Sequence, residues 1–231
     1  MLLYGIKAVV TGGSRGIGYQ ICKILLENGA SVLAVSRDQE KLSEAKRRMP
    51  DLLVLKADIS LATDTDRVTA WVQDNWGVLD VLVNNAGILP ENEMALTNQS
   101  DEVFELTMKV NVLGPYLCTK RLLALLLKSE DPRIVNVGST SGVFALDLQG
   151  AYSVSKVALH ALTIATANEL KGKVAVNALS PGWVRTDMSP DAPGAPRTSA
   201  ESLLWLLNQQ RGFTGKLVDG ESEMKWSSIG K

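Results

Sequence analysis

A tyrosine and a lysine four residues apart could carry out proton chemistry. Tyr152 and Lys156 lie in a segment whose pattern predicts a helix starting near Ala151, so their side chains share one helix face. The pKa of a free phenol is about 10, which makes it a poor acid at neutral pH. A neighbouring ammonium group stabilises the phenolate and lowers that pKa. The pair could therefore give a proton to an oxygen atom on which negative charge develops.

A glycine-rich loop near the start of the chain could hold a dinucleotide. It spans residues 11–18, between an apolar strand-like segment and an apolar-periodic helix, and it carries Gly12, Gly16 and Gly18. Glycines let the backbone approach a pyrophosphate, and a helix that begins near Arg15 directs its positive dipole end toward the same charge. The spacing is Gly-x-x-x-Gly-x-Gly rather than Gly-x-Gly-x-x-Gly. Such a turn could also serve only the close packing of a strand against a helix.

These candidate groups need a scaffold that brings them together. Short apolar segments alternate with helical patterns, and the predicted strands are residues 7–10, 31–35, 52–56, 79–83, 133–137, 174–178 and 216–218. Strands that are almost entirely apolar are covered on both faces, so the alternation predicts a Rossmann-like, doubly wound parallel sheet of about seven strands in three αβα layers. Ligands bind beyond the carboxyl ends of such strands, where the candidate motifs all fall.

Length and composition limit the classes of protein to which the chain can belong. With 231 residues, of which 45% are hydrophobic, residues 1–231 are predicted to form one domain. The net charge of −1, without long charged runs, favours neither a nucleic acid nor an anionic membrane as partner. No targeting segment is recognisable, and the longest apolar run, residues 122–127, is too short to span a bilayer, which predicts a cytoplasmic protein. The two cysteines lack the spacing of a metal site.

The order of the motifs resembles that of the short-chain dehydrogenase/reductase family over nearly the whole chain. The family marks are the loop 11–18, Asp58, residues 84–87, Asn111, Ser139, Tyr152 with Lys156, and Pro181 and Gly182 with Thr186. A Tyr-x-x-x-Lys match alone arises often by chance, whereas a series of motifs in family order and at family spacing does not. Within the family, the sequence looks most like NADPH-dependent carbonyl reductases, including the bacterial ketoacyl reductases.

The resemblance implies a catalytic group of four residues: Asn111, Ser139, Tyr152 and Lys156. Tyr152 would be the acid, and Lys156 would both stabilise the phenolate and hydrogen bond the nicotinamide ribose. Ser139 would hold the substrate oxygen, although its neighbours Thr140 and Ser141 could be mistaken for it. Asn111 would lie at a helix distortion that holds water for a proton relay.

His160 is the only histidine and lies one helical turn beyond Lys156. Its Cα is expected about 12 Å along the helix axis from that of Tyr152, because eight residues separate them. The family mechanism has no histidine at this place. We therefore interpret His160 as a packing or interface residue rather than a general base.

Residues at the end of the second predicted strand favour NADP over NAD. An acidic side chain there binds the ribose hydroxyls of NAD, whereas a basic one accommodates the 2′-phosphate of NADP. Ser36 replaces the acidic residue, and Arg37 can pair with phosphate, with Arg15 as a second cation. Asp38 could compete for Arg37 or receive a ribose hydroxyl. The complete predicted cofactor site is Gly12, Ser14, Arg15, Gly16, Ile17, Gly18, Ser36, Arg37, Asp58, Ile59, Asn85, Ala86, Gly87, Tyr152, Lys156, Pro181, Gly182, Val184 and Thr186.

The substrate site is expected to be apolar. In this family the pocket walls come from three segments, which here contain Leu89, Val143, Phe144, Leu146, Leu148, Trp183 and Met188. These side chains suit an apolar carbonyl compound, although apolar residues at strand ends could also belong to the core. The segment between Thr186 and a helix predicted near Ser199 is short, which indicates an open, permissive cleft.

Together these features predict the NADPH-dependent reduction of an apolar aldehyde or ketone to the alcohol. One alternative is a 3-oxoacyl-thioester reductase that acts on acyl-carrier-protein or coenzyme A substrates. A second, from a different class, is a regulator that binds NADP without turnover.

The long helices predicted within residues 112–128 and 151–170 are apolar around more of their circumference than one sheet face requires. This surplus predicts a homodimer or homotetramer joined partly through these helices. Burial of the surplus beneath loops of the same chain is the alternative.

Overall fold

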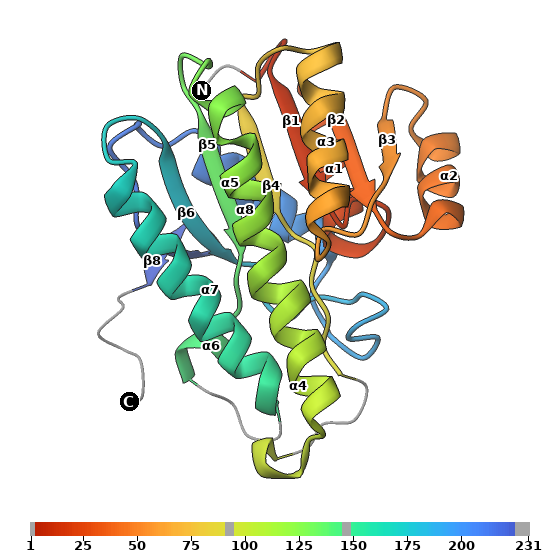
Figure 1. Cartoon of the computed structure of the whole chain (residues 1–231), viewed down its shortest axis with the longest axis vertical. Helices are drawn as coiled ribbons and strands as arrows, with labels where there is room; N and C mark the ends of the chain where they lie inside the picture. The colour runs from red at the N-terminus through yellow and green to blue at the C-terminus, as the bar shows by residue number, and fades with distance from the viewer. Residues whose placement is uncertain (1–2, 91–94, 145–148, 225–231) are drawn as a thin grey trace.

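A sheet of eight strands organises the described residues, which are 3–90, 95–144 and 149–224 of the computed structural model (Figure 1). The strands are β1 (Lys7–Thr11), β2 (Ser31–Ser36), β3 (Leu53–Lys56), β4 (Val81–Asn84), β5 (Arg133–Val137), β6 (Ala175–Ser180), β7 (Leu217–Asp219) and β8 (Ser222–Met224). They are arranged in the order β3-β2-β1-β4-β5-β6-β7-β8. All neighbouring pairs are parallel except β7 with β8, which form a hairpin in which Gly220 has a φ of 60°. The predicted doubly wound fold is confirmed, with one additional antiparallel strand.

Helices cover both faces of the sheet (Figure 1). On one face lie α1 (Gly16–Glu27), α2 (Gln39–Arg48) and α8 (Pro196–Leu207). On the other lie α3 (Ala62–Asn75), α5 (Gly114–Leu126) and α7 (Gly150–Glu169). The short segments are η1 (Leu96–Asn98), α4 (Asp101–Met108), the π-helix η2 (Lys109–Leu113) and α6 (Ser141–Phe144). Because α4, η2 and α5 follow each other without a break, they form one long, locally widened rod.

The core explains why the strands are apolar on both sides. In β1, Val10 packs in the cluster that includes α1, α2 and α8, whereas its neighbour Val9 packs in the cluster of α3, α5 and α7. Both valines are completely buried. Alternate residues of a strand point to opposite faces, so a strand buried twice must be apolar throughout.

The strand order creates the crevice in which the candidate motifs meet. From β1 the chain continues to β2 on one side, and β4 later returns to the other side of β1. The helices that follow β1 and β4 therefore diverge, which opens the sheet edge beyond their carboxyl ends. Among the described residues, no helix is both long and apolar enough to cross a membrane.

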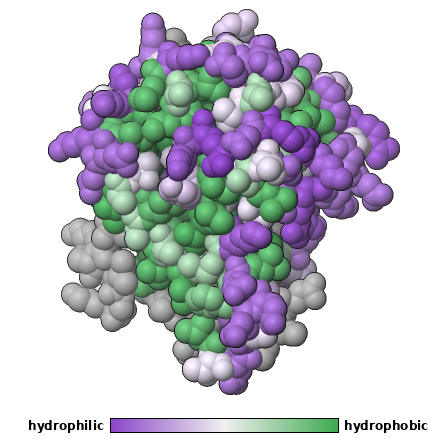
Figure 2. Space-filling view, in the orientation of Figure 1, coloured by the Kyte–Doolittle hydropathy of each residue, from purple (hydrophilic) through white to green (hydrophobic). Residues whose placement is uncertain are grey.

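Some apolar side chains remain on the surface of the helices that cover the sheet. Figure 2 shows hydrophobic residues gathered over α5 and α7. On α7, Val157, Ala161 and Ala165 are exposed at intervals of four residues. The leucines of residues 122–127, which were expected to add to this surface, are mostly buried, because the stripe formed by Leu122, Leu125 and Leu126 faces the sheet. Exposed apolar residues lie instead on the rod before them, at Phe104, Leu106, Leu113 and Tyr116.

Candidate active site

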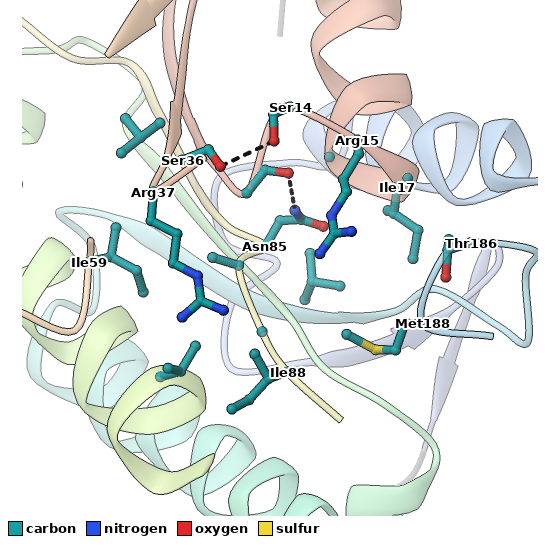
Figure 3. Close-up of a pocket in the computed structure, with 18 of the residues that line it drawn as sticks. Ser14, Arg15, Ile17, Ser36, Arg37, Ile59, Asn85, Ile88, Thr186 and Met188 are labelled. Carbon is teal, nitrogen blue, oxygen red and sulfur yellow. Dashed lines mark hydrogen bonds between the residues drawn. The ribbon is translucent and has the colours of Figure 1, made fainter. Parts of the chain in front are cut away.

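A cavity of about 210 Å³ lies at the carboxyl ends of the strands (Figure 3). It is lined by every predicted cofactor residue except Gly182 and Val184. Val184 is buried and forms an isolated bridge with Gly194. Residues far apart in the sequence, such as Arg15, Asp58 and Tyr152, are thereby brought to one site.

Three glycines of the loop, Gly12, Gly16 and Gly18, are each required for a different structural reason. Gly12 has a φ of 65°, and a Cβ there would lie 2.9 Å from the Cα of Ala86. A Cβ on Gly18 would collide with the carbonyl group of Gly12, so this glycine serves close packing between loop and helix. Gly16 has a φ of 55°, and its Cβ would meet only the Thr186 side chain, 3.3 Å away across the cavity. Some glycines of the loop thus serve close packing, whereas Gly16 leaves backbone open to the cavity.

Thr11 and Asn85 hold the glycine loop against the end of β4. The Thr11 hydroxyl accepts hydrogen bonds from the backbone N–H groups of Asn85 (3.0 Å) and Ala86 (3.1 Å). The Asn85 side chain donates to the carbonyl oxygens of Thr11 (2.9 Å) and Gly12 (3.2 Å). The role of Thr11 was not predicted from the sequence, in which only its place as a hydroxyl residue at the end of a strand could have indicated it.

Cationic and hydroxyl side chains gather at the end of β2. Ser14 donates to the hydroxyl of Ser36 at 3.1 Å, and both arginines, Arg15 and Arg37, extend over the cavity (Figure 3). Arg15 forms an exposed ion pair with Asp187 at 2.7 Å. Arg37 is exposed and has no hydrogen-bond or ion-pair partner among the described residues.

Asp38, which could have formed an ion pair with Arg37, instead caps a helix. Its carboxylate accepts a hydrogen bond from the backbone N–H of Lys41 at 3.0 Å and so caps the N-terminus of α2. This is the preferred position for an aspartate. The cap leaves Arg37 available for an anion.

Tyr152 and Lys156 share one face of α7, as their spacing predicts. The Lys156 Nζ atom lies 5.5 Å from the centre of the Tyr152 ring and donates a hydrogen bond to the Val137 carbonyl at 2.9 Å. Burial lowers the pKa of Lys156 to about 8. Burial also raises the pKa of Tyr152, and a hydrogen bond with Ser139 acts in the opposite direction. The lowered phenol pKa that the sequence predicts is therefore absent from the protein alone, because desolvation exceeds the favourable contacts.

Ser139 lies two residues after the end of β5 and is held by Ser141. Its Oγ accepts a hydrogen bond from the backbone N–H of Ser141 at 3.1 Å and donates to the Ser141 hydroxyl at the same distance. Ser141 is buried and begins α6, so it supports Ser139 rather than replacing it.

Asn111 lies in the π-helix η2, which is the helix distortion that the family resemblance implies. Its Nδ2 donates to the carbonyl of Ile88 at 2.9 Å and to the hydroxyl of Ser155 at 3.0 Å. Its Oδ1 accepts from the backbone N–H of Ile88 at 2.8 Å. The side chain thus connects the end of β4 to α7 beneath Lys156.

Of the predicted substrate-wall side chains that the structure describes, Met188 alone lines the cavity. Trp183 is 68% exposed, and Leu89 is half-buried without lining it. Val143 belongs to the core, packed in a small cluster with Ala178 and Leu217, because the short helix α6 turns it inward. Leu146, Leu148 and the side chain of Phe144 lie outside the described residues. Apolar lining that the sequence analysis missed comes from Val35, Ala57, Ile88, Val110 and Val137.

Comparison with known proteins agrees with this geometry. The family model for short chain dehydrogenase matches residues 7–195. A farnesol dehydrogenase of Aedes aegypti is 35% identical over 199 residues, 81% of this chain and 81% of that protein. A 3-oxoacyl-acyl-carrier-protein reductase of rhamnolipids biosynthesis from Pseudomonas aeruginosa is 39% identical over 204 residues, 84% of this chain and 79% of that protein.

Solved structures show the same fold. A short chain dehydrogenase of Shigella flexneri 2a complexed with NADP superposes with a TM-score of 0.88 at 27% identity, covering 96% of this chain and 99% of that one. The RhlG/NADP active-site complex of Pseudomonas aeruginosa superposes with a TM-score of 0.87 at 32% identity, covering 94% and 95%. On these grounds the chain belongs to the short-chain dehydrogenase/reductase family.

Proposed function

We propose that the protein catalyses the NADPH-dependent reduction of an apolar aldehyde or ketone to the alcohol. The observation that carries this proposal is the placement of three residues together: Tyr152 and Lys156 line the cavity, and Ser139 hydrogen bonds the Tyr152 side chain. Oxidoreductase activity follows from membership of the family.

The cofactor is NADP, as the sequence predicts, and the cavity fits it. The N-terminus of α1 and the left-handed Gly16 offer a pyrophosphate unobstructed backbone. Arg37, which has no partner within the described part of the chain, provides a guanidinium group for a 2′-phosphate, with Ser36 in place of an acidic residue. Two structural neighbours are NADP complexes.

The chain's own residues supply and direct the proton. When bound, NADPH provides the hydride. Ser139 and Tyr152 hydrogen bond the substrate oxygen, and the Tyr152 hydroxyl gives up its proton as negative charge develops on that oxygen. Lys156, whose Nζ lies beside the phenol ring, stabilises the phenolate that remains. Asn111 connects the backbone of Ile88, which follows β4, to Ser155 of α7, the helix that carries Tyr152 and Lys156.

The substrate is proposed to be apolar because apolar side chains line the cavity that Tyr152 also lines. Ile88, Val110 and Met188 line the cavity together with Tyr152. A 3-oxoacyl thioester is the second candidate, since one relative carries the name of a 3-oxoacyl-acyl-carrier-protein reductase at 39% identity. Such a substrate also presents a ketone on an aliphatic chain.

A screen of NADPH oxidation against aldehydes, ketones, diketones and acetoacetyl thioesters tests the proposal. We expect turnover of at least one simple carbonyl compound. Saturation at lower concentration by an acyl-carrier thioester than by any free ketone would favour the second candidate. Binding of NADPH without oxidation by any compound would support a regulator instead.

We further propose a homodimer or homotetramer that acts in the cytoplasm. The support for association is the exposed apolar stripe of Val157, Ala161 and Ala165 on α7, and Tyr116 of α5 is also exposed. Two copies related by a twofold axis would bury these stripes against each other.

A further inference from the structure

The single histidine of the chain lies beneath the loop that carries Ser139. His160 is on α7, two turns beyond Tyr152, and only 1% of its surface is exposed. Its Nε2 atom accepts a hydrogen bond from the backbone N–H of Ser139 over 3.5 Å. Because this hydrogen bond is long, the contact between His160 and Ser139 depends on packing as well as on the hydrogen bond.

The segment that carries Ser139 packs closely against the imidazole ring of His160. We define the Ser139 loop as residues 138–142, which begins and ends with glycine. A Cβ on Gly138 would collide with Nε2 of His160, and a Cβ on Gly142 would lie 2.8 Å from Cε1 of the same ring. Neither glycine has a positive φ, so backbone conformation does not explain them. The missing side chain of Gly138 leaves the space that the ring occupies, and that of Gly142 leaves space for both the ring and Lys156, whose backbone carbonyl carbon would also lie 2.8 Å from the Cβ.

We propose that His160 is a positioning residue that holds the Ser139 loop, and through it the Ser139 hydroxyl, in the geometry required for carbonyl reduction. This inference rests on the proposed function, because it assigns His160 a task only if Ser139 binds the reacting oxygen. The His160 ring accepts a hydrogen bond from the backbone of Ser139, while the backbone N–H of Ser141 donates one to the Ser139 hydroxyl. Together these contacts leave the loop little freedom.

The protonation state of His160 suits an acceptor. Burial, and then the charge of Lys156, lower its pKa to about 4, while a hydrogen bond with the Gly142 backbone acts against them. At neutral pH the ring is therefore uncharged, and one of its nitrogens can accept the Ser139 N–H. A leucine at this position could fill the space but could not accept that bond.

His160 cannot itself exchange a proton with the substrate. Its Cα lies about 12 Å along the helix axis from that of Tyr152. Its ring is covered by the Ser139 loop and is not among the described residues that line the cavity. Its effect on the reaction must therefore pass through Ser139.

Two amide substitutions separate positioning from simple packing. The His160→Gln side chain places an oxygen near the former Nε2 position, whereas that of His160→Asn is one bond too short to reach it. Thr163→Val is the matched control, because Thr163 is equally buried on the next turn of α7 and bonds to Asn136, not to the Ser139 loop. All four proteins are compared for kcat with the best carbonyl substrate, for the Kd of NADPH, and for amide hydrogen exchange of residues 138–143.

We expect His160→Asn to lower kcat by about tenfold, the scale of a small misplacement of a reacting group, without changing the Kd of NADPH. Exchange of residues 138–143 should accelerate in this variant and stay slow in His160→Gln and Thr163→Val. In a Ser139→Ala background, His160→Asn should change kcat by less than about twofold, because the two residues act as one unit.

Three outcomes would overturn the proposal. They are unchanged exchange and kcat in His160→Asn, an equal loss of kcat in Thr163→Val, or additive effects of His160→Asn and Ser139→Ala. If Ser139→Ala retained normal kcat, the assigned role of Ser139 would fail and His160 positioning with it. If Ser139→Ala lost activity but His160→Asn did not, only the positioning inference would fail.

Discussion

Asn111 and Ile88 exchange two hydrogen bonds across 23 residues of sequence. The backbone N–H of Ile88 donates to Oδ1 of Asn111 at 2.8 Å, and Nδ2 of Asn111 donates to the Ile88 carbonyl at 2.9 Å. Ile88 lines the cavity directly after the residues that hold the glycine loop. The buried amide of Asn111, which does not itself line the cavity, therefore fixes one wall of the cofactor site from the π-helix η2.

Asn111→Ala should weaken both the fold and cofactor binding. It leaves the polar backbone groups of Ile88 without partners, which we expect to lower the free energy of unfolding by about 2 to 4 kcal/mol. The Kd for NADPH should rise as well. Thr107→Val is the control, because Thr107 is also buried but bonds only within its own helix. Equal effects of both variants on the Kd would contradict the role of Asn111.

Tyr152→Phe should abolish most of the turnover while leaving the cofactor bound. Loss of a general acid is expected to lower kcat by at least about a hundredfold. The ring remains in place beside Lys156, so the Kd for NADPH should stay near that of the unmutated protein. Single-turnover measurement of NADPH oxidation checks the first point and fluorescence titration the second. Near-normal turnover would rule out the proposed mechanism.

Arg37→Ala should narrow the preference for NADPH over NADH. A guanidinium-phosphate contact contributes about 1.5 to 3 kcal/mol, so KM for NADPH should rise roughly ten- to a hundredfold while KM for NADH changes little. Arg47→Ala provides a comparison, since Arg47 is exposed on α2 but does not line the cavity. The assignment would be wrong if the unmutated protein had equal kcat/KM for both cofactors.

Lys156→Met should inactivate the enzyme and yet stabilise the cofactor-free fold. Burial lowers the pKa of Lys156 from 10.5 to about 8, which corresponds to roughly 3 kcal/mol of unfavourable charge burial at neutral pH. Loss of the hydrogen bond to Val137 offsets part of this gain. We therefore expect Lys156→Met to raise the free energy of unfolding by about 1 to 3 kcal/mol, measured by urea unfolding at pH 7.

The difference in stability between Lys156→Met and the unmutated protein should change with pH in one direction. Between pH 8 and 10.5 the unfolded chain holds the Lys156 proton more tightly than the folded protein does, so the unmutated protein gains stability as pH rises. The advantage of Lys156→Met should therefore shrink across this window. A variant less stable than the unmutated protein at pH 7 would show that the buried ammonium is better compensated than its low pKa indicates.

Light scattering at micromolar concentration should report a mass of at least twice the 24.9 kDa of one chain. Ala161→Glu places a charge in the exposed stripe of α7 and should dissociate the assembly without unfolding the protein. Lys23→Glu, which also changes charge on an exposed helix position but on α1, should leave the mass unchanged. A mass near 25 kDa for the unmutated protein would show that the apolar stripe has another purpose.

The sequence by itself determined the fold class and the main chemical groups because both have local signatures. Apolar runs such as residues 31–35 identify strands buried on two faces, and a spacing of four places Tyr152 and Lys156 on one helix face. The glycine loop and Arg37 could be assigned from their positions after strands, since parallel strands deliver their carboxyl ends to one edge.

Only the tertiary structure decided which residues support these groups. Thr11 contacts Asn85 across 74 residues, and His160 reaches Ser139 across 21, and neither pair has a periodicity that a sequence could reveal. The same holds for the apolar wall, where Met188 lines the cavity and Val143 does not. It also holds for the pKa of Tyr152, which the spacing of charges alone predicted to fall and which burial raises. Packing and desolvation depend on the whole surroundings of a side chain, and those surroundings exist only once the chain has folded.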